Sequence, residues 1–470
     1  MMIIIGDEKM IQKKSIFSKE GQTALNTSLT NTFIGTKKTN EDKNNENKDV
    51  KLAYKSAIAS FFGTFLEFYD FTLFGYLAVI IGSLFFPKES TTATLLYYFA
   101  IFGVGFVMRP IGALFFGWLG DTFIGRRNTL LITISMMGIV SLAMGLMPTY
   151  AEIGIWATIL LVIFRLLQGF SLGGEFGGGI TLTAEFAPKE RRGYFVSIAQ
   201  LAQSGLLSTG LLYLFSIMMS KTAFIEYGWR ILFIFGVVIA LAGVYIRIKL
   251  TETPEFEDIK KKKEILRIPA ATVVTKKIPM MLLVIFLAAI PLSYTFIVFG
   301  VTYLTTYTHF SYSNALLITT IASAFFLLIT IPAGWLSDKI GRKKVVLFGL
   351  IGEAILVIPF YMLLGLAIFS IVLILYIIEE LFHGIYNGTY GQMMAEIFPT
   401  NMRYTGIALS YNLGVGIIGG FTPFILTYLI TVTHNTLAPL YWLIPLIIVP
   451  IIMIFIWYKE TKGKDLATLS

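Results

Sequence analysis

The chain has 470 residues, of which 56% are hydrophobic and only 14% are charged. This composition excludes an ordinary soluble protein, because the surface of a fold of this length needs more polar residues, and it places the chain in a lipid bilayer. The absence of cysteine excludes disulfides, thiol catalysis and thiolate metal sites, and the three histidines lie too far apart in the sequence to suggest a histidine metal cluster.

The first element is a polar tail over residues 1–53. Its stretch TKKTNEDKNNENKDVK at 36–51 has too few apolar residues to form a core, so we expect the tail to be disordered. The opening MMIIIGDEKM has too short an apolar run and too many charges for a cleaved signal peptide.

Twelve apolar runs follow the tail, each long enough for a helix to cross about 30 Å of hydrocarbon. We expect an all-α membrane protein with a six-helix bundle over 54–248, a hydrophilic linker over 249–278, a second six-helix bundle over 279–458 and a short tail over 459–470. The expected spans are 54–83, 94–119, 129–147, 153–183, 194–219, 229–248, 279–307, 314–336, 345–364, 368–394, 404–430 and 438–458.

Basic residues favour one side of the membrane. Of the 37 lysine and arginine residues, 32 fall in the tail and in the loops that alternate with it, whereas only Lys88 and Lys221 fall in the opposite loops. The positive-inside rule therefore predicts a multi-pass protein of the plasma membrane with both termini in the cytoplasm. Because these charges flank spans and lack interleaved aromatic residues, nucleic acid is not expected as a partner.

Two segments of the first half return in the second half. GWLGDTFIGRR at 117–127 matches GWLSDKIGRKK at 334–344, and AEFAPKERRGYF at 184–195 matches AEIFPTNMRYTG at 395–406. Repeats of this kind form two bundles that rock about a binding site near the bilayer midplane. The repeat therefore predicts a transporter that works by alternating access.

The paired GxLxDxxGRK-type loops resemble the signature of the major facilitator superfamily. Further segments are similar to the metabolite:proton symporter family within it, and these are EFYDF at 67–71, RPIGALFFGWLGD at 109–121, RLLQGFSLGGEFGGG at 165–179, AEIFPTNMRYTGIALSYNLG at 395–414 and ETKGKDL at 460–466. The resemblance covers residues 54–466. It implies the major facilitator fold, with two pseudo-symmetric six-helix bundles, and proton-coupled transport of a small metabolite.

The first of these loops departs from the superfamily pattern. Three residues separate Asp121 from Gly125, where the pattern and the second loop have two.

Carboxylates in the first span need an explanation, because an ionised side chain at the bilayer centre costs about 2.5–3.5 kcal/mol on insertion scales. Glu67 and Asp70 are three residues apart, so they project about 60° from each other, and we expect both to face a cavity inside the bundle. Two nearby carboxylates cannot both ionise cheaply there, so one should load and release a proton. We predict proton coupling through Asp70, Glu67 and Glu175 of the fourth span. The alternative is that these acids pair with membrane arginines and hold helices together.

Arginines in two spans are candidates for binding the substrate. Arg165, Gln168 and Glu175 share one stripe of the fourth span. Arg109 precedes Pro110 in the second span, where a fixed guanidinium would suit a substrate carboxylate. The alternative for Arg109 is a salt bridge to one of the buried acids.

The tenth span has a polar stripe of Glu380, His383 and Asn387, with Glu379 beside it. In the repeat this span corresponds to the fourth, so we expect the stripe to face the same cavity and to set substrate choice or form a second titrating site. The alternative is a local Glu–His pair that is satisfied within the bundle. Tyr303 of the seventh span is a further candidate for a substrate contact.

The charged loop motifs are expected to form gates at the cytoplasmic mouth. Ion pairs between the two bundles would hold this mouth closed and would break when it opens. The candidates are Asp121, Arg126, Arg127, Glu185, Arg192, Asp338, Arg342, Lys343, Glu396 and Arg403.

Together these features predict a proton-coupled uptake carrier for a small polar metabolite, either an organic acid or a zwitterionic osmolyte. The alternatives are a uniporter or exporter of the same fold, and a solute receptor that does not transport. An enzyme is not expected, since no motif combines a nucleophile with a base or a metal set. No cofactor and no metal ion are expected. The expected partners are the substrate, a proton and the bilayer, with the chain acting as a monomer.

Overall fold

The computed structural model of the chain describes residues 40–87, 91–262, 265–289 and 299–466. Contacts separate the residues up to Lys51 from a unit that runs from Leu52 to Ser470. The first helix of the described residues, α3, spans Asn40–Tyr76, so the end of the expected tail, residues 40–53, is helical. The rest of that tail, residues 1–39, lies outside the described residues.

The long elements of the described chain are helices, which suits a bilayer because a helix satisfies its backbone N–H and C=O groups within its own segment. The first half continues with α4 (Ala78–Phe85), α5 (Thr91–Trp118), α6 (Gly125–Gly145), α7 (Tyr150–Ile153), α8 (Ile155–Phe186), α9 (Arg192–Gln200), α10 (Leu206–Met218), α11 (Lys221–Ala223) and α12 (Trp229–Ile248). Two helices, α13 (Pro254–Lys262) and α14 (Pro269–Lys276), form the linker. The second half has α15 (Ile278–Ala288), α16 (Gly300–Thr306), α17 (Tyr312–Ile340), α18 (Arg342–Leu364), α19 (Phe369–Ile397), α20 (Arg403–Leu413), α21 (Thr422–Thr433) and α22 (Leu440–Trp457).

Eleven helices among the described residues are long and apolar enough to cross a membrane. A bent pair, α14 and α15, which meet at 96°, gives a twelfth if it is taken as one span. The expected seventh span, 279–307, is described only at its two ends, as α15 and α16, because residues 290–298 lie outside the described residues.

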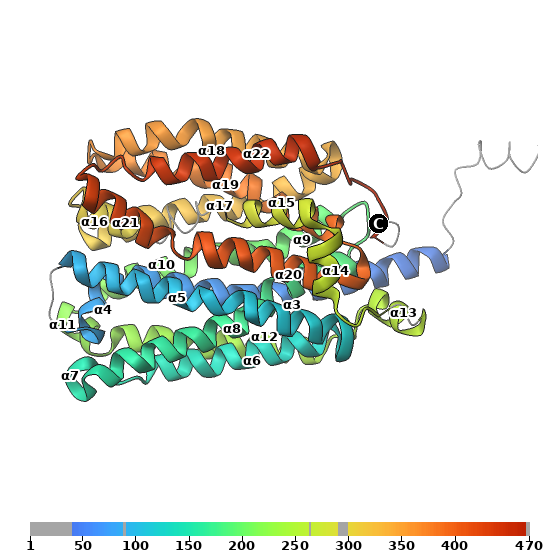
Figure 1. The fold of residues 1–470 in the computed structure, drawn as a ribbon, viewed down its shortest axis with the longest axis horizontal. Helices are drawn as coiled ribbons and strands as arrows, with labels where there is room; N and C mark the ends of the chain where they lie inside the picture. Colours follow the sequence, from blue (N-terminus) through green and yellow to red (C-terminus); the bar gives the residue numbers. More distant parts are fainter. Residues whose placement is uncertain (1–39, 88–90, 263–264, 290–298, 467–470) are drawn as a thin grey trace, which may run out of the picture. The chain divides into compact units, whose positions relative to one another are not determined.

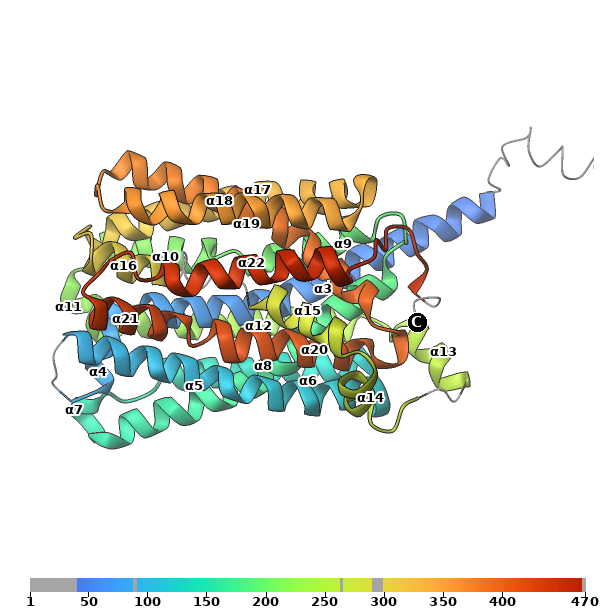
Figure 2. The ribbon, with the colours of Figure 1, turned by 45° about the horizontal axis from the view of Figure 1, so that its top comes forward.

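The two halves meet along helices that correspond in the repeat. In the first half α5, α8, α6 and α12 pack in series, and in the second half α17, α19, α18 and α22 do the same (Figures 1 and 2). Across the junction α9 and α10 pack on α17, and α20 packs on α5 and α8. The fifth expected span therefore contacts the eighth, and the eleventh contacts the second, as a duplicated six-helix unit requires.

Glycines in α8 bring helices close on both sides. A Cβ on Gly173 would lie 2.3 Å from backbone atoms of Arg109 and Ala113 in α5. A Cβ on Gly177 would lie 2.7 Å from the Cα of Ala408 in α20, which belongs to the other half. Small residues thus let α8 pack within its own bundle and across the junction.

Candidate functional site

Of the two acids predicted in the first span, the first, Glu67 of α3, joins the two halves of the molecule. Glu67 is buried and forms an ion pair with Arg109 of α5. The same guanidinium donates from Nε to Oδ1 of Asn412 in α20 at 2.8 Å. Asn412 donates in turn to the carbonyl oxygen of Gly173 in α8 at 2.7 Å. Arg109 therefore takes the salt bridge that was the alternative expectation, and it connects an acid of the first half to an amide of the second.

The second acid, Asp70, lies among helices of the first half. Its Oδ1 accepts a hydrogen bond from the Ser141 hydroxyl of α6 at 3.0 Å, and its Oδ2 accepts one from the Gln168 amide of α8 at 3.1 Å. Gln168 in turn accepts a hydrogen bond from Arg165 at 2.5 Å. The Gln168 amide thus links the Arg165 guanidinium to the Asp70 carboxylate through two hydrogen bonds. The polar stripe predicted on the fourth span therefore contacts one of the two acids predicted on the first span.

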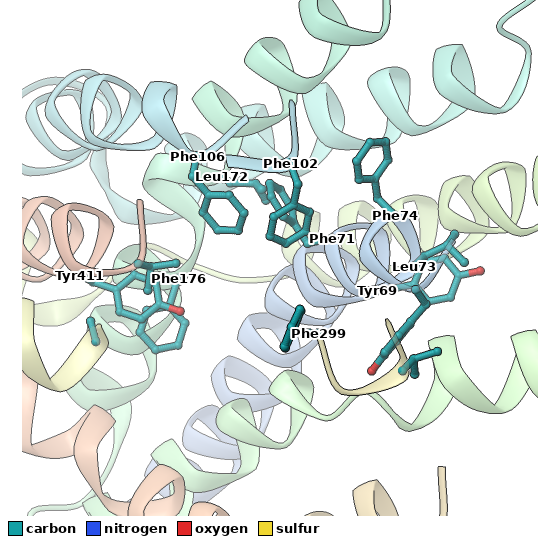
Figure 3. Close-up of a cluster of buried hydrophobic side chains, with 14 of the residues drawn as sticks. Tyr69, Phe71, Leu73, Phe74, Phe102, Phe106, Leu172, Phe176, Phe299 and Tyr411 are labelled. Atoms are coloured by element: carbon teal, nitrogen blue, oxygen red, sulfur yellow. The ribbon is translucent and has the colours of Figure 1, made fainter. Parts of the chain in front are cut away.

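Aromatic rings enclose the Arg165 guanidinium. Its carbon Cζ lies 4.0 Å from the ring centre of Phe71, 4.3 Å from that of Phe74 and 5.5 Å from that of Phe102. Figure 3 shows these rings gathered between α3 and α5. Cation–π attraction stabilises a charge in such a setting, since the ring faces carry negative potential. The guanidinium is held by α3 and α5 as well as by its own helix.

The third acid that we expected to carry protons, Glu175, belongs to a separate ion pair. Its carboxylate pairs with Arg247 of α12 and accepts a hydrogen bond from Thr133 of α6 at 2.6 Å. The amino-acid sequence of α8 places Glu175 on the same stripe as Arg165, but its partners bind it to α6 and α12.

A small cavity of about 20 Å³, room for about one water molecule, lies between the two halves. A hydrogen-bonded chain crosses it, since Asn387 of α19 donates to Gln203 at 2.7 Å and Gln203 donates to the Tyr390 hydroxyl at 2.8 Å. Gln203 follows α9, where a short 3₁₀ turn, Leu201–Gln203, interrupts the fifth span. The lining residues are Phe68, Gln203, Leu287, Ala288, His383, Tyr386, Asn387, Tyr390, Tyr411 and Val415.

The lining differs in part from the expected site. His383 and Asn387 line the cavity as expected, whereas Gln203 was missed. Glu67 and Asp70 do not line it, although Phe68, which lies between them in the sequence, does. The expected cavity contacts that lie elsewhere are Glu67, Asp70, Arg109, Arg165, Gln168, Tyr303 and Glu380.

Tyr303 packs at the far end of the second half. Its hydroxyl donates to the carbonyl oxygen of Thr436 at 3.2 Å, and its ring meets those of Phe299 and Tyr361 edge-on. The packing role that aromatic membrane residues commonly have fits these contacts better than a substrate contact does.

His383 is paired with an acid that the sequence analysis did not single out. Its Nδ1 lies 3.2 Å from Oε1 of Glu353 in α18. The local Glu–His pair therefore exists, but its carboxylate comes from the neighbouring helix rather than from Glu380.

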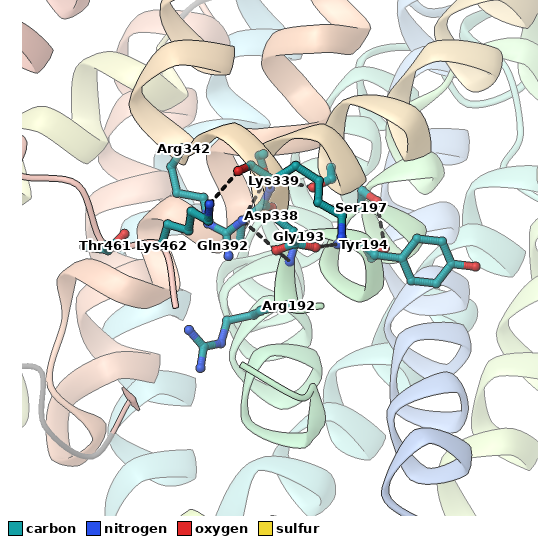
Figure 4. A network of polar contacts seen from close by, with 12 residues as sticks. Arg192, Gly193, Tyr194, Ser197, Asp338, Lys339, Arg342, Gln392, Thr461 and Lys462 are labelled. Carbon is teal, nitrogen blue, oxygen red and sulfur yellow. Dashed lines mark hydrogen bonds and ion pairs between the residues drawn. The ribbon is translucent and has the colours of Figure 1, made fainter. Parts of the chain in front are cut away.

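The two corresponding aspartates of the repeat each bind a helix of the opposite half. Asp121 accepts hydrogen bonds from the backbone N–H of Thr405 at 2.8 Å and from its hydroxyl at 2.6 Å, in the first turn of α20. Asp338 accepts from the N–H groups of Gly193 and Tyr194, both at 2.9 Å, in the first turn of α9 (Figure 4). A carboxylate at a helix N-terminus is favourable because unpaired N–H groups and the helix dipole meet it.

Two ion pairs accompany these contacts. Glu185 of the first half pairs with Arg403 at 2.9 Å, and Arg192 pairs with Glu396 of the second half at 2.7 Å. Each acid of the repeated AE motif thus takes the arginine of the other copy. We call the four contacts, through Asp121, Asp338, Glu185–Arg403 and Arg192–Glu396, the latch.

The remaining basic candidates divide into two kinds. Arg126 lies 3.3 Å from Asp121, and Arg342 lies 2.6 Å from Asp338 and 3.1 Å from Glu396, so both support latch acids. Arg127 donates to the carbonyl oxygens of Arg247 and Ile248, and Lys343 to those of Phe455 and Tyr458, all within their own halves. The expectation that Arg127 and Lys343 bridge the bundles finds no support in these contacts.

Comparison with known proteins agrees with this arrangement. Residues 55–276 match the family model for sugar (and other) transporters, and residues 281–469 match that for the major facilitator superfamily. A putative proline/betaine transporter of Staphylococcus aureus is 33% identical over 435 residues, which cover 90% of this chain and 93% of that protein. The chain belongs to the major facilitator superfamily.

Other relatives extend the comparison. The shikimate transporter of Escherichia coli is 36% identical over 388 residues, covering 81% of this chain and 88% of that protein. Among solved structures, the proton:xylose symporter XylE of E. coli aligns with a TM-score of 0.72 over 90% of this chain and 99% of its own, at 19% identity. The expected fold is thus confirmed as a multi-pass major facilitator fold, and the chain is a transporter-family protein rather than an enzyme.

The extra residue in the first superfamily loop is absorbed by a π-helical turn. After α5 the residues Leu119–Phe123 form this turn, in which the N–H of Ile124 bonds to the carbonyl oxygen of Leu119 at 3.0 Å. A π turn adds one residue to a helix without changing its direction. Asp121 therefore reaches the opposite half as Asp338 does, although its loop is longer.

The sequence analysis assigned no role to two further acids of this major facilitator protein, although one of them, Glu460, opens the ETKGKDL segment. Glu252 accepts hydrogen bonds from the N–H groups of Arg126 and Arg127 at 3.1 and 3.2 Å. Glu460 accepts from the N–H groups of Arg342 and Lys343 at 3.0 and 3.1 Å. Each acid follows the last helix of its half and caps the helix after the superfamily loop. The glutamate–threonine pairs at 252–253 and 460–461 carry the only sequence signal for this repeat.

The glycine before each capped helix has a backbone that suits the cap. Gly125 has φ +86° and Gly341 has φ +105°, which other residues rarely adopt. A Cβ on Gly125 would lie 2.1 Å from Glu252, and a Cβ on Gly341 would lie 2.5 Å from Glu460. Burial raises the pKa of Glu252, although the N–H of Thr253 and the Arg126 charge oppose the shift.

Proposed function

We propose that this chain is a proton-coupled symporter that takes up a small carboxylate-bearing metabolite by alternating access. The observation that carries the proposal is the position of Arg109, between Glu67 of the first half and Asn412 of the second. A guanidinium at such a junction binds carboxylates well, because its fork can hold two oxygens at once.

Competition for Arg109 would couple the substrate to a proton. Glu67 uses Oε1 to bind Arg109, while its Oε2 has no hydrogen-bond partner among the described residues. A proton on Glu67 would weaken the pair and free the guanidinium for a substrate carboxylate. Departure of the substrate would let Glu67 ionise and reform the pair. Asp70 is the second candidate acid, and its bonds to Ser141 and Gln168 would respond to the same helix movements.

The latch would govern access to the cavity from one side. Its four contacts join the halves at the end of the helices that carries the superfamily loops, so they must break when that end opens. The positive-inside rule assigns this end to the cytoplasm. With the latch closed, the substrate would enter from outside, and opening of the latch would release it into the cell.

The names of the relatives and the cavity lining together favour a zwitterion. Proline, betaine and shikimate, named for the relatives, all carry a carboxylate. The cavity adds the rings of Phe68, Tyr386, Tyr390 and Tyr411, and aromatic faces attract substituted ammonium groups. Proline or betaine would therefore use both Arg109 and the rings, whereas an organic acid would use Arg109 alone.

Uptake into proteoliposomes under an imposed pH gradient tests the proposal, with labelled proline, betaine and shikimate as probes. Wild-type protein should accumulate at least one of them, and collapse of the gradient should abolish accumulation. Glu67→Gln or Asp70→Asn should uncouple accumulation from the gradient while exchange persists. Arg109→Ala should raise the half-saturating concentration more than about tenfold, since a charged hydrogen bond contributes about 1.5–3 kcal/mol.

Glu190→Gln is the matched control, because this acid is exposed and pairs only weakly with Lys189 at 3.9 Å. The control should transport as wild type does. Gradient-independent equilibration by the wild-type protein would instead identify a uniporter, and binding without uptake would identify a receptor.

A further inference from the structure

The second half contains ionisable side chains that the transport proposal does not use. Glu353 of α18 and Glu379, Glu380 and His383 of α19 are each at most 3% exposed. Both helices lie among the membrane-crossing set. Among the described residues, no lysine or arginine forms an ion pair with any of the four, and the Glu353–His383 contact is their only ion pair.

Three of these residues converge on one point. Glu353, Glu379 and His383 each offer one ligand atom, and these atoms lie within 4.8 Å of one another. We call them the α18–α19 cluster. Nδ1 of His383 lies 3.2 Å from Oε1 of Glu353. Neither carboxylate oxygen of Glu379 has a hydrogen-bond partner among the described residues, although this side chain is buried.

The donor set matches the chemistry of a divalent metal. Imidazole nitrogen and carboxylate oxygen bind ions such as Zn²⁺ and Mn²⁺ at about 2.0–2.2 Å, which sets neighbouring ligand atoms about 3–3.5 Å apart. The His383–Glu353 separation already has this value. We propose that Glu353, Glu379 and His383 bind one divalent transition-metal cation inside the second half.

A proton alone satisfies this cluster less well than a cation does. Protonation would neutralise Glu379, but the new O–H group would then need an acceptor. The described surroundings supply no hydrogen-bond partner to either oxygen of Glu379. A divalent cation satisfies an oxygen of Glu379 directly and offsets the charge of both carboxylates, which low-dielectric burial makes costly.

The cavity adjoins the site. His383 lines the cavity between the halves as well as belonging to the cluster. Opening of the halves about this cavity would let an ion reach the imidazole from that side without crossing lipid. The bound cation would lie beside the residues that line the cavity, including Asn387, and its presence does not depend on which solute the protein transports.

Metal content of the purified full-length protein tests the inference directly. The protein is stripped with a chelator, incubated with Zn²⁺ or Mn²⁺, desalted and measured by mass spectrometry of the metal. Wild-type protein should retain one ion per chain. Glu379→Gln and His383→Gln should each raise the apparent Kd more than about 100-fold, since loss of an outer-sphere partner alone costs 10–100-fold.

Glu380→Gln is the control, because this buried acid is the neighbour of Glu379 but lies outside the ligand set. It should retain the ion. Metal should raise the melting temperature of the wild type and of Glu380→Gln. Glu379→Gln should melt cooperatively at a temperature that metal does not change, which shows that this variant is folded but does not bind the ion. Absence of stoichiometric metal in the wild type, which would leave protons as the only ligands of the cluster, overturns the inference. Equal retention by Glu379→Gln and His383→Gln, or loss in Glu380→Gln alone, also overturns it.

Discussion

In the spans of the first half, Glu67 and Glu175 each face an arginine, whereas Glu353 and Glu379 in the spans of the second half have no arginine or lysine partner among the described residues. Glu67 pairs with Arg109, and Glu175 pairs with Arg247. The carboxylates of the α18–α19 cluster have only a histidine as an ion-pair partner among the described residues. Fixed cations therefore balance these two charges of the first half, whereas the α18–α19 cluster would need a proton or a cation from solution.

This difference has a physical consequence for how the halves respond to substitution. Removal of one member of a buried ion pair leaves an uncompensated charge, which costs about 3–5 kcal/mol. Removal of a carboxylate that has no fixed counter-charge instead removes the free-energy cost of burying that charge. The same kind of change should therefore have opposite effects in the two halves.

The largest expected effect is the loss of Arg247. Arg247→Leu should lower the free energy of unfolding by about 3–5 kcal/mol, because Glu175 would stay buried without its partner. Thermal and denaturant unfolding in detergent would measure this change. The double variant Arg247→Leu, Glu175→Leu should recover most of the lost stability, as neutral replacements of buried pairs often do.

The matching change in the second half is Glu379→Gln, measured in metal-free protein. It should leave stability within about 1 kcal/mol of the wild type or raise it, since an unpaired buried carboxylate is replaced by a neutral amide. A loss of stability as large as that of Arg247→Leu would contradict the comparison, because it would show that a fixed partner also neutralises Glu379.

Substitutions in the latch test whether the corresponding aspartates of the two halves contribute equally to keeping it closed. Asp338→Asn and Asp121→Asn each weaken two charge-assisted hydrogen bonds at a helix N-terminus, each worth about 1.5–3 kcal/mol. Each variant should therefore shift the population toward the state with the latch open by about 10- to 100-fold.

The readout uses the absence of native cysteine. Ser197→Cys places a thiol at a buried position of α9, where the Ser197 side chain closely approaches Gly334 of α17. Its labelling by a maleimide should accelerate in both aspartate variants and stay unchanged with Glu190→Gln. Acceleration in only one of the two would show that one half alone holds the latch closed.

The sequence predicts the spans and the latch acids well, for a physical reason. Hydropathy reflects the free-energy cost of exposing polar groups to lipid. Summed over the twenty or so residues of a span, this cost outweighs the structural preferences of single residues. The repeated loops identified Asp121 and Asp338 because both copies must meet equivalent helices. Their partners could not be predicted, since the pairing of Glu185 with Arg403 depends on how two halves distant in sequence come together.

The cavity residues were harder to predict from the sequence. Helical spacing placed Glu380, His383 and Asn387 on one stripe, but the neighbouring helices divide them. Asn387 bonds to Gln203, while His383 meets Glu353. Glu353 is a single acid in an otherwise apolar span and matches no motif, so only the packing of α18 on α19 reveals it.

The smallest expected effect concerns the superfamily loop, which is one residue longer in the first half than in the second. Deletion of Phe123 would give the first loop the two-residue spacing of the second, by converting the π turn at Leu119–Phe123 to an α-helical one. Phe123 is 72% exposed, so its loss removes little packing. Stability should change by about 1 kcal/mol or less, and uptake should persist.

Deletion of Lys339 is the matched control in the second loop, where α17 is regular up to Ile340. Here the loss of one residue rotates the following chain by about 100° relative to Asp338. Arg342 would then leave its contacts with Asp338 and Glu396, and uptake should fail. If deletion of Phe123 is as damaging as deletion of Lys339, the π turn has a function of its own, and the two loops are not equivalent gates of different length. If both deletions are tolerated, the spacing between aspartate and glycine does not set the geometry of the latch. The packing of α20 on α5 and of α9 on α17 must then maintain the contacts of Asp121 and Asp338 with the opposite helices.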